Sequence, residues 1–564
     1  MQLTYVFPIL ILLFIGLFFF GCPSPASAVI ENTPKSAFGR RDAIALGIIT
    51  AVYAVTAFIG LGDTDAPQSF HDFHSGESMT VDLGEVRSID GIMLYSGLNT
   101  GSYRIELSDD ENNFSDAGSF EQNYVALFKW NDFELDALQV PNARYIRLTA
   151  SGDVRLGELA VRCGGKLFGQ CSDAPELFDE QSTVPEYQSY LNSTYFDEIY
   201  HARTAYENIE GVYPYEISHP PLGKLIIAIG IELFGMTPFG WRFSGVLFGV
   251  AMLPVLYALL KRMFGSTDIC ACATAIFAFD FMHFSQTRLA TIDTYAVFFI
   301  LLMYLFMYMY ITGGRKRDLA LSGLFFGIGA ACKWTCFYAG AGLAVIWLVH
   351  WLRNFEVKAF FKNCAFCVVF FIIIPAAIYY MSYYPYGRAS GMHGIGMYFT
   401  SDYANLVLDN QKFMFSYHSG VHTEHPYSSR WWQWVIDERP ILYYLKYFED
   451  GTRSSFGAFL NPVLCWAGLI AMALCAVFAI KRRDDVSLFI LIGYLAQLLP
   501  WVFITLARMF RLMKDNTKGW KFNVYGLTGL ACALFVVFYP VLSGLRVNAQ
   551  LASNLLKWLP SWPF

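Results

Sequence analysis

The sequence predicts a polytopic α-helical membrane protein with an extracytoplasmic β-sandwich inserted between its transmembrane segments. Hydrophobic residues make up 55% of the 564 residues and charged residues only 15%, whereas an average soluble domain carries about 25% charged residues. Apolar segments long enough to cross a bilayer recur along most of the chain. Between residues 66 and 165, apolar residues alternate with polar ones instead, which is typical of strands. The net charge of -6 argues against a nucleic-acid binder, which needs a basic surface.

A transmembrane helix needs about 20 mostly apolar residues. Residues 4–21 form the first such segment, and a signal peptide cleaved near Ala26–Ala28 is the alternative. Arg40 and Arg41 favour an uncleaved span, because cleavage would leave both cations outside the cytoplasm. The further candidate spans are 43–62, 241–260, 268–286, 291–312, 318–334, 336–352, 359–381, 461–480, 486–507 and 523–546.

Basic residues mark cytoplasmic loops and therefore set the direction of these spans. Arg40 and Arg41 precede the span at 43–62, which then runs outward and leaves residues 63–240 outside. This orientation requires that 222–236, which is short and carries charges, is an interfacial helix on the outer face. The later basic clusters, up to the one at 481–483, agree with this orientation of the spans. One span is lacking before the next basic loop, so we expect an irregularity near 503–510.

Composition and span positions divide the chain into successive regions. These are N-terminal transmembrane segments (1–65), a β-sandwich (66–165), an extracytoplasmic catalytic loop with the interfacial helix (166–240), transmembrane helices (241–381), an extracytoplasmic loop (382–457) and C-terminal transmembrane helices (458–564).

The β-sandwich prediction rests on short strands with a period of two, such as the one that contains Val81 and Leu83. The order of its elements, notably the run 143–162, resembles the discoidin (factor V/VIII type C) jelly roll. Such modules often bind glycans or surfaces through their loops. The domain is either a binding module of that kind or a passive spacer.

Two adjacent carboxylates, Asp197 and Glu198, lie among apolar and aromatic residues near the end of the first outside loop. A carboxylate at the membrane surface can act as a general base toward a hydroxyl group. On the pair alone, a solvated acidic loop without chemistry would be the better interpretation. The charged residues that the topology gathers on the same face favour a functional site.

His219 to Lys224, the run His-Pro-Pro-Leu-Gly-Lys, opens the interfacial helix, so Lys224 would lie near its positive end, where a lipid phosphate can be held. Arg242, Arg288, Asp293 and Lys333 are also expected at outer helix ends. A single cation of this kind often only snorkels to the interface. A cluster of acids and cations at the membrane edge instead suits a phosphate-linked lipid donor.

Other polar residues allow two interpretations each. Asp280 lies inside the span 268–286, where an unpaired carboxylate is costly, and is either a site residue or a hydrogen-bond partner between helices. The region 382–457 is rich in Tyr, Trp and His, and its His418, His422 and His425 suggest a metal site or hydrogen-bonded loop histidines. Acidic partners are sparse there, so we predict no metal site.

Taken together, these motifs resemble the protein O-mannosyltransferase family, membrane glycosyltransferases of the GT-C type. The resemblance covers about residues 190–500 and the last span. The matching pieces are Phe196-Asp197-Glu198, His219 to Lys224, Trp241-Arg242-Phe243, Arg288 to Thr294, Ala331 to Thr335, and His425 to Ser429 with Trp431 and Trp432. The inserted jelly roll is not typical of the family.

The resemblance implies that mannose passes from a polyprenyl-phosphate donor to Ser or Thr hydroxyls of exported proteins, outside the cytoplasm and with inversion of the anomer. Asp197 would be the general base and Glu198 its partner at the acceptor. The candidates for binding the donor phosphate are Lys224, Arg242, Arg288 and Lys333, and further site candidates are His219, Asp280, Asp293 and His425. Because the leaving group is already a phosphate, cations can stabilise it, and we expect neither a cofactor nor a metal.

Two other functions remain open from the sequence. The first is a related GT-C transferase that glycosylates a lipid or a cell-wall polymer with the same kind of donor. The second is a non-enzymatic, membrane-anchored receptor that displays the jelly roll to bind glycans. Substitution of Asp197 separates the receptor from both enzymes, and the identity of the labelled product separates the two enzymes.

Overall fold

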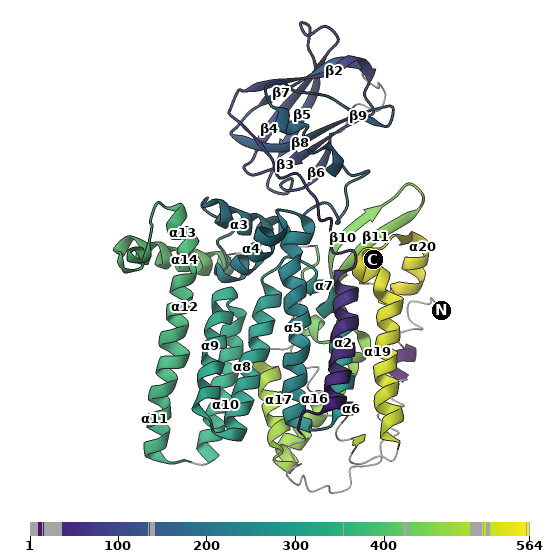
Figure 1. Ribbon diagram of the computed structural model, residues 1–564. Helices are drawn as coiled ribbons and strands as arrows, with labels where there is room; N and C mark the ends of the chain where they lie inside the picture. The colour runs from purple at the N-terminus through teal and green to yellow at the C-terminus, as the bar shows by residue number, and fades with distance from the viewer. Residues whose placement is uncertain are drawn as a thin grey trace. The chain divides into compact units, whose positions relative to one another are not determined.

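The computed structural model describes residues 9–13, 15, 37–133, 135, 142–353, 355–420, 426–429, 431–496, 510, 513–514, 519–559 and 561–562. The chain forms two compact units. The first joins Met1–Ile59, Gly211–Ile226 and Ser244–Phe564, and the second joins Gly60–Glu210 and Ile227–Phe243. Figure 1 labels most of the helices and strands of both units.

The second unit contains an antiparallel β-sandwich. One sheet has the strand order β1-β8-β3-β6, with β9 paired to β8, and the other has the order β2-β7-β4-β5. The strands are β1 (His71–Phe73), β2 (Ser78–Ser88), β3 (Gly91–Ser96), β4 (Gly101–Ser108), β5 (Ser115–Gln122), β6 (Trp130–Phe133), β7 (Asn142–Ala150), β8 (Val154–Cys163) and β9 (Lys166–Phe168). Alternate side chains, such as those of Val81, Ile105 and Leu148, form the buried core. The predicted β domain is therefore present, while its resemblance to discoidin stays a prediction.

Helix α3 (Glu198–Glu210) belongs to the same unit as the sandwich. The segment before it is held by the hydroxyl of Thr194, which donates a hydrogen bond of 3.1 Å to the carbonyl of Leu127. Along the helix, Tyr206 packs edge-on against Phe128 with ring centroids 5.2 Å apart. The segment that carries Asp197 is thus fixed to the β domain by both polar and aromatic contacts.

The first unit is built from long apolar helices, several of which run side by side in Figure 1. The described residues include seven helices long and apolar enough to cross a membrane, or eight if α6 and α7 form one bent span. They are α2 (Arg40–Phe58), α5 (Pro238–Phe264), α8 (Asp293–Gly313), α10 (Thr335–Arg353), the continuous run Val357–Ala389, α16 (Pro462–Arg482) and α19 (Trp520–Ser543). The predicted polytopic helical fold is confirmed.

Three predicted spans differ in detail. The segment 268–286 is broken into α6 (Thr267–Ala278) and α7 (Phe281–Thr287), which meet at 56°, because Asp280 caps α7. Helix α9 (Lys316–Cys332) has 17 residues, so it is shorter than a typical span of about 20 residues. Helix α17 (Asp485–Ala496) covers the start of the span predicted at 486–507. The rest of that span, and the irregularity near 503–510 except residue 510, lie outside the described residues, as does most of 4–21.

The stretch 222–236 forms α4 (Leu222–Phe234), a helix of 13 residues. At about 1.5 Å per residue it is roughly 20 Å long, too short for a hydrocarbon core about 30 Å thick. The prediction that it does not cross the membrane agrees with this length.

The region 382–457, which the sequence predicts to be an extracytoplasmic loop between membrane segments, contains regular structure. It includes α13 (Tyr384–Ala389), α14 (Ser401–Gly420), α15 (Trp431–Val435) and the hairpin β10 (Ile441–Tyr447) and β11 (Thr452–Ala458), which β12 (Val547–Asn548) extends to three strands. Buried residues of α14 recur at Tyr403, Val407, Asn410 and Met414, which is the spacing of one helical face. The many aromatic and polar residues of this region conceal that pattern in the sequence.

Candidate functional site

Asp197 immediately precedes the first residue of α3. Its backbone carbonyl accepts hydrogen bonds from the amides of Tyr200 (3.1 Å) and His201 (3.0 Å), so it is placed at the helix N-terminus. The residue before it, Phe196, has a φ of 48°, a left-handed conformation that costs a side-chain-bearing residue about 1–2 kcal/mol. Strained backbone of this kind is found preferentially at functional sites. The strain turns the chain so that a partly exposed Asp197 follows a buried Tyr195.

Glu198 forms a fully buried ion pair with Arg242. The guanidinium Nε donates to Oε1 and Nη2 donates to Oε2 of the carboxylate, both at 2.8 Å, and both side chains are 0% exposed. The other N–H groups of Arg242 donate to the backbone carbonyls of Leu61 and Tyr190 (2.8 and 2.7 Å) and of Ser193 (2.9 Å). A guanidinium has five N–H donors, and all five of Arg242 are used within the protein.

This pair connects three separate segments of the second unit: the residues before the sandwich, the loop before α3, and the start of α5. Charge-assisted bidentate hydrogen bonds are shorter and stronger than neutral ones. Arg242 therefore fixes the position of Glu198 and, through it, the start of α3 next to Asp197.

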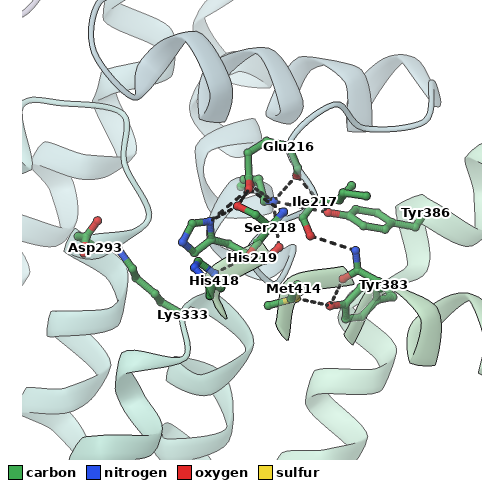
Figure 2. Close-up of polar contacts among 12 residues, drawn as sticks. Glu216, Ile217, Ser218, His219, Asp293, Lys333, Tyr383, Tyr386, Met414 and His418 are labelled. Carbon is green, nitrogen blue, oxygen red and sulfur yellow. Dashed lines mark hydrogen bonds and ion pairs between the residues drawn. The ribbon is translucent and has the colours of Figure 1, made fainter. Parts of the chain in front are cut away.

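A second polar cluster lies in the first unit around Glu216, and Figure 2 shows its contacts. The carboxylate oxygen Oε2 of Glu216 accepts a hydrogen bond from Lys224 Nζ at 2.5 Å. The other oxygen, Oε1, accepts from the Ser218 amide at 2.8 Å and contacts His219 Nδ1 at 3.2 Å. Lys224, which is 0% exposed, also donates to the carbonyls of Glu216 (2.6 Å) and His219 (3.1 Å). The predicted His-Pro-Pro-Leu-Gly-Lys segment is folded around this one acid.

The imidazole of His219 is held at one nitrogen by Glu216 and packs edge-on against His418, with ring centroids 5.1 Å apart. His418, at the end of α14, donates from Nε2 to the Ser218 carbonyl at 2.9 Å. Its ring also lies 6.1 Å from that of Trp334. These contacts join the segment before α4 to α14 and to the start of α10.

Lys333 and Asp293 form an ion pair of 2.7 Å, drawn at one edge of Figure 2. Both side chains are partly exposed, at 21% and 38%. The pair lies near the start of α4 because Gly223 has no side chain: a Cβ there would be 2.7 Å from Cγ2 of Ile292, the residue before Asp293. Lys333 itself directly follows the last residue of α9.

Arg288 and Asp280 make contacts with the backbone of the first unit. Arg288 Nη1 donates to the carbonyls of Ala57 (2.7 Å) and Ile59 (2.8 Å) at the end of α2, where a cation is favoured by the helix dipole. Asp280 accepts from the amides of His283 (3.0 Å) and Asn461 (2.9 Å), so it caps α7 and meets the start of α16.

The remaining candidates are distributed as follows. His425 lies outside the described residues. Within the described part of the chain, three acidic residues close enough to share a cation are Glu158, Asp179 and Glu180, which belong to the β-sandwich unit and not to the clusters above. Burial raises the pKa of the Glu158 carboxyl to about 7.

The structure thus separates the sequence-predicted residues into groups. Asp197, Glu198 and Arg242 belong to the second unit, and the other described candidates belong to the first. Sequence reasoning missed Glu216, which organises the second cluster. The available signal was an acid three residues before His219 in a segment that Pro214 and Pro220 hold irregular.

Comparison with known proteins agrees with these motifs. Residues 218–379 match the family described as dolichyl-phosphate-mannose-protein mannosyltransferase, and residues 403–510 match the C-terminal four-transmembrane region of protein O-mannosyltransferase. The polyprenol-phosphate-mannose–protein mannosyltransferase of Mycobacterium tuberculosis is 26% identical over 475 residues, which cover 70% of this chain and 88% of the relative. The enzyme of the same name from Mycolicibacterium smegmatis is 25% identical over 423 residues, covering 61% and 82%.

A solved structure has the same fold. The S. cerevisiae protein O-mannosyltransferase complex bound to the sugar donor superimposes with a TM-score of 0.56 and 11% sequence identity, covering 66% of this chain and 89% of that chain. The helical part of the molecule therefore has the GT-C architecture. Residues 218–379 and 403–510 therefore resemble the protein O-mannosyltransferase family, and the chain is a multi-pass membrane protein.

Proposed function

We propose that this protein transfers mannose from a polyprenyl-phosphate donor to Ser or Thr hydroxyls of exported proteins, on the extracytoplasmic face of the membrane. The single observation that carries the proposal is the match to mycobacterial enzymes named for this donor and for a protein acceptor, along 88% of the length of one of them. The transmembrane helices supply access to a lipid-linked sugar.

Asp197 is the proposed general base. The acceptor hydroxyl oxygen attacks C1 of mannose, and its proton passes to the Asp197 carboxylate. The bond between C1 and the phosphate oxygen breaks, and the lipid phosphate leaves with the bonding electrons, so the anomer is inverted. The proposal is supported by the partial exposure of Asp197 and by the strained Phe196 before it. A correctly placed general base contributes about 10²- to 10⁴-fold to rate.

Glu198 and Arg242 have a positioning role in this proposal. The sequence suggested Glu198 at the acceptor and Arg242 at the donor phosphate, but their groups bind each other, and no N–H of Arg242 remains for a phosphate. Their contribution is to hold the N-terminus of α3, and with it Asp197, in one place. Catalytic groups need such support, because small displacements reduce rate strongly.

Lys333 is the proposed cation for the donor phosphate. Among the cations predicted from sequence, Lys224 is fully buried against Glu216, and Arg288 donates to carbonyls at the end of α2. Lys333 keeps part of its surface exposed and is held by Asp293. A phosphate that carries developing negative charge is stabilised by such a positioned cation.

The β-sandwich is proposed to lie outside the cytoplasm with Asp197 and to bind a glycan or another surface ligand. This placement is supported by the hydrogen bond and the aromatic contact that fix α3 and the segment before it to the sandwich within one unit. A binding module joined to the catalytic helix would deliver or select acceptors.

The reaction is tested with membranes that contain the protein, labelled polyprenyl-phosphate mannose and a peptide rich in Ser and Thr. We expect label in the peptide, as inverted O-linked mannose, and none with a peptide in which Ala replaces every Ser and Thr. Label in lipid or polymer alone would instead support the related GT-C reaction. No transfer from an intact donor to any acceptor would contradict the proposal.

A further inference from the structure

The hairpin β10–β11 carries a buried cation with unused hydrogen-bond donors. Arg453, in β11, is 5% exposed. Its Nε and Nη2 are buried without a hydrogen-bond partner, and its side chain makes no ion pair within the part of the chain that the structure describes. A guanidinium stays charged in proteins and presents donors in a planar fork. A charge placed like this is costly unless an anion accompanies it.

A second unsatisfied group lies on the same face of the strand. The hydroxyl of Ser455 is also buried without a partner among the described residues, and Ser455 is 1% exposed. Residues i and i+2 of a strand point to the same side of the sheet. A guanidinium and a hydroxyl beside each other form a donor set suited to a tetrahedral oxyanion.

The position of this donor set indicates what kind of anion it meets. Arg453 pairs with Tyr447 of β10 and Val547 of β12. Strand β11 ends just before the transmembrane helix α16, and β12 begins just after the end of α19. Arg453 therefore lies beside the end of α19, at the level where membrane lipids carry their phosphates.

We propose that Arg453 and Ser455 bind the phosphate of a membrane lipid. This site is separate from the Asp293–Lys333 pair and does not depend on the proposed sugar transfer. The phosphate comes either from a bilayer phospholipid or from a polyprenyl phosphate, and both present the same oxygens to the guanidinium fork. A bidentate arginine contact explains why a guanidinium, and not a hydroxyl alone, is buried at this position.

The test uses the purified full chain in detergent with Arg453→Met, which keeps much of the length of the side chain and removes its charge. Without lipid, Arg453→Met is expected to be as thermally stable as the wild type or more so, because it removes a buried unpaired charge. With lipid, we expect it to bind about 10- to 100-fold more weakly than the wild type. Arg453→Lys should recover part of the affinity and Ser455→Ala should lose a smaller part.

The ligands are two lipids, phosphatidylglycerol and a polyprenyl phosphate without sugar, and inorganic phosphate, which stands for the headgroup without a lipid tail. Each is titrated while thermal stability is followed. Binding of phosphatidylglycerol alone assigns a headgroup site, and binding of polyprenyl phosphate alone assigns a carrier site. Either result, or binding of both lipids, supports the proposal when Arg453→Met weakens that binding about 10- to 100-fold.

The matched control is Arg546→Met in the loop before β12. Arg546 is 41% exposed and pairs with Asp450 at 2.8 Å, so its loss should leave lipid binding within about twofold of the wild type. Equal lipid affinity of the wild type and Arg453→Met would overturn the proposal. So would a large loss of lipid-free stability in Arg453→Met, because the guanidinium would then have a partner within the protein. Absent sugar transfer would leave these binding results standing and would contradict only the proposed function.

Discussion

The buried pair of Arg242 and Glu198 gives the sharpest prediction about stability. Arg242→Met removes both hydrogen bonds to Glu198 and those to three backbone carbonyls, and leaves a carboxylate that is 0% exposed without its counterion. Removing one partner of a buried ion pair costs about 3–5 kcal/mol. For a unit of about 150–250 residues, each kcal/mol lowers the melting temperature by about 2–4 °C. We therefore expect a decrease of about 6–20 °C.

The assay is thermal unfolding of the purified full chain, together with transfer kinetics below the melting temperature. Arg104→Met is the control, since Arg104 pairs with Asp116 at 3.1 Å and both side chains are more than half exposed; such pairs contribute about 1 kcal/mol or less. The double variant Glu198→Gln, Arg242→Met should recover part of the lost stability, because no charge is left unpaired.

The kinetics separate a positioning role from donor binding. If Arg242 holds α3 in place, Arg242→Met lowers kcat and leaves the KM for the donor within about threefold, because ground-state binding of donor is unaffected. An unchanged melting temperature with a donor KM raised more than tenfold would refute this reasoning. It would show that the guanidinium meets the donor phosphate.

Phe196→Gly should keep the wild-type rate of mannose transfer, whereas Phe196→Val should transfer at least tenfold more slowly. The reason is that a β-branched side chain tolerates the φ of 48° poorly and Gly tolerates it well. Equal rates in both variants would show that the turn does not position Asp197. The melting temperature of the wild type should fall between pH 5 and 7 and then level off, because burial raises the pKa of Glu158 to about 7. In that range the folded state binds more protons than the unfolded state, so stability falls by at most about 1.4 kcal/mol per pH unit as the pH rises. A Glu158→Gln protein whose melting temperature still fell as steeply with pH would show that Glu158 is not the cause. Lys224→Met should lower the melting temperature by about 4–6 °C, because it leaves Glu216 buried without its cation and the first unit is large. Glu216→Gln in the same protein should reverse part of that loss, and a double variant no more stable than Lys224→Met would argue against the pair.

The sequence predicted the architecture because membrane helices and strands leave strong periodic signals. The break at Asp280 was not predicted, because a hydropathy window averages over a single capping residue. Its acidic side chain was the only visible signal, and the interpretation as a hydrogen-bond partner agrees with its contacts to backbone amides. The helix α14 was missed because its buried face is built from tyrosine, asparagine and methionine as well as valine.

The candidate residues were found from motif and topology, but their partners were not. Arg242 uses carbonyls that precede it by between 49 and 181 residues, and no local pattern predicts such contacts. Arg453 was not singled out at all, since it lies in a polar stretch whose strand pairing with Val547 depends on the far end of the chain. The sequence shows the sign of a charge and its approximate depth in the membrane. Only the folded structure shows whether backbone carbonyls already accept all the hydrogen bonds that a side chain can donate.

In the proposed reaction, Asp197 takes the proton of the acceptor hydroxyl during mannose transfer. The most direct measurement compares the rate of mannose transfer to peptide by the wild type, Asp197→Asn and Asp109→Asn, an exposed residue of the β-sandwich, with folding of each verified by thermal unfolding. We predict that Asp197→Asn is slower by about 10²- to 10⁴-fold with an unchanged melting temperature, and that Asp109→Asn is unaffected. Transfer by a folded Asp197→Asn protein at a rate within threefold of the wild type would contradict the account.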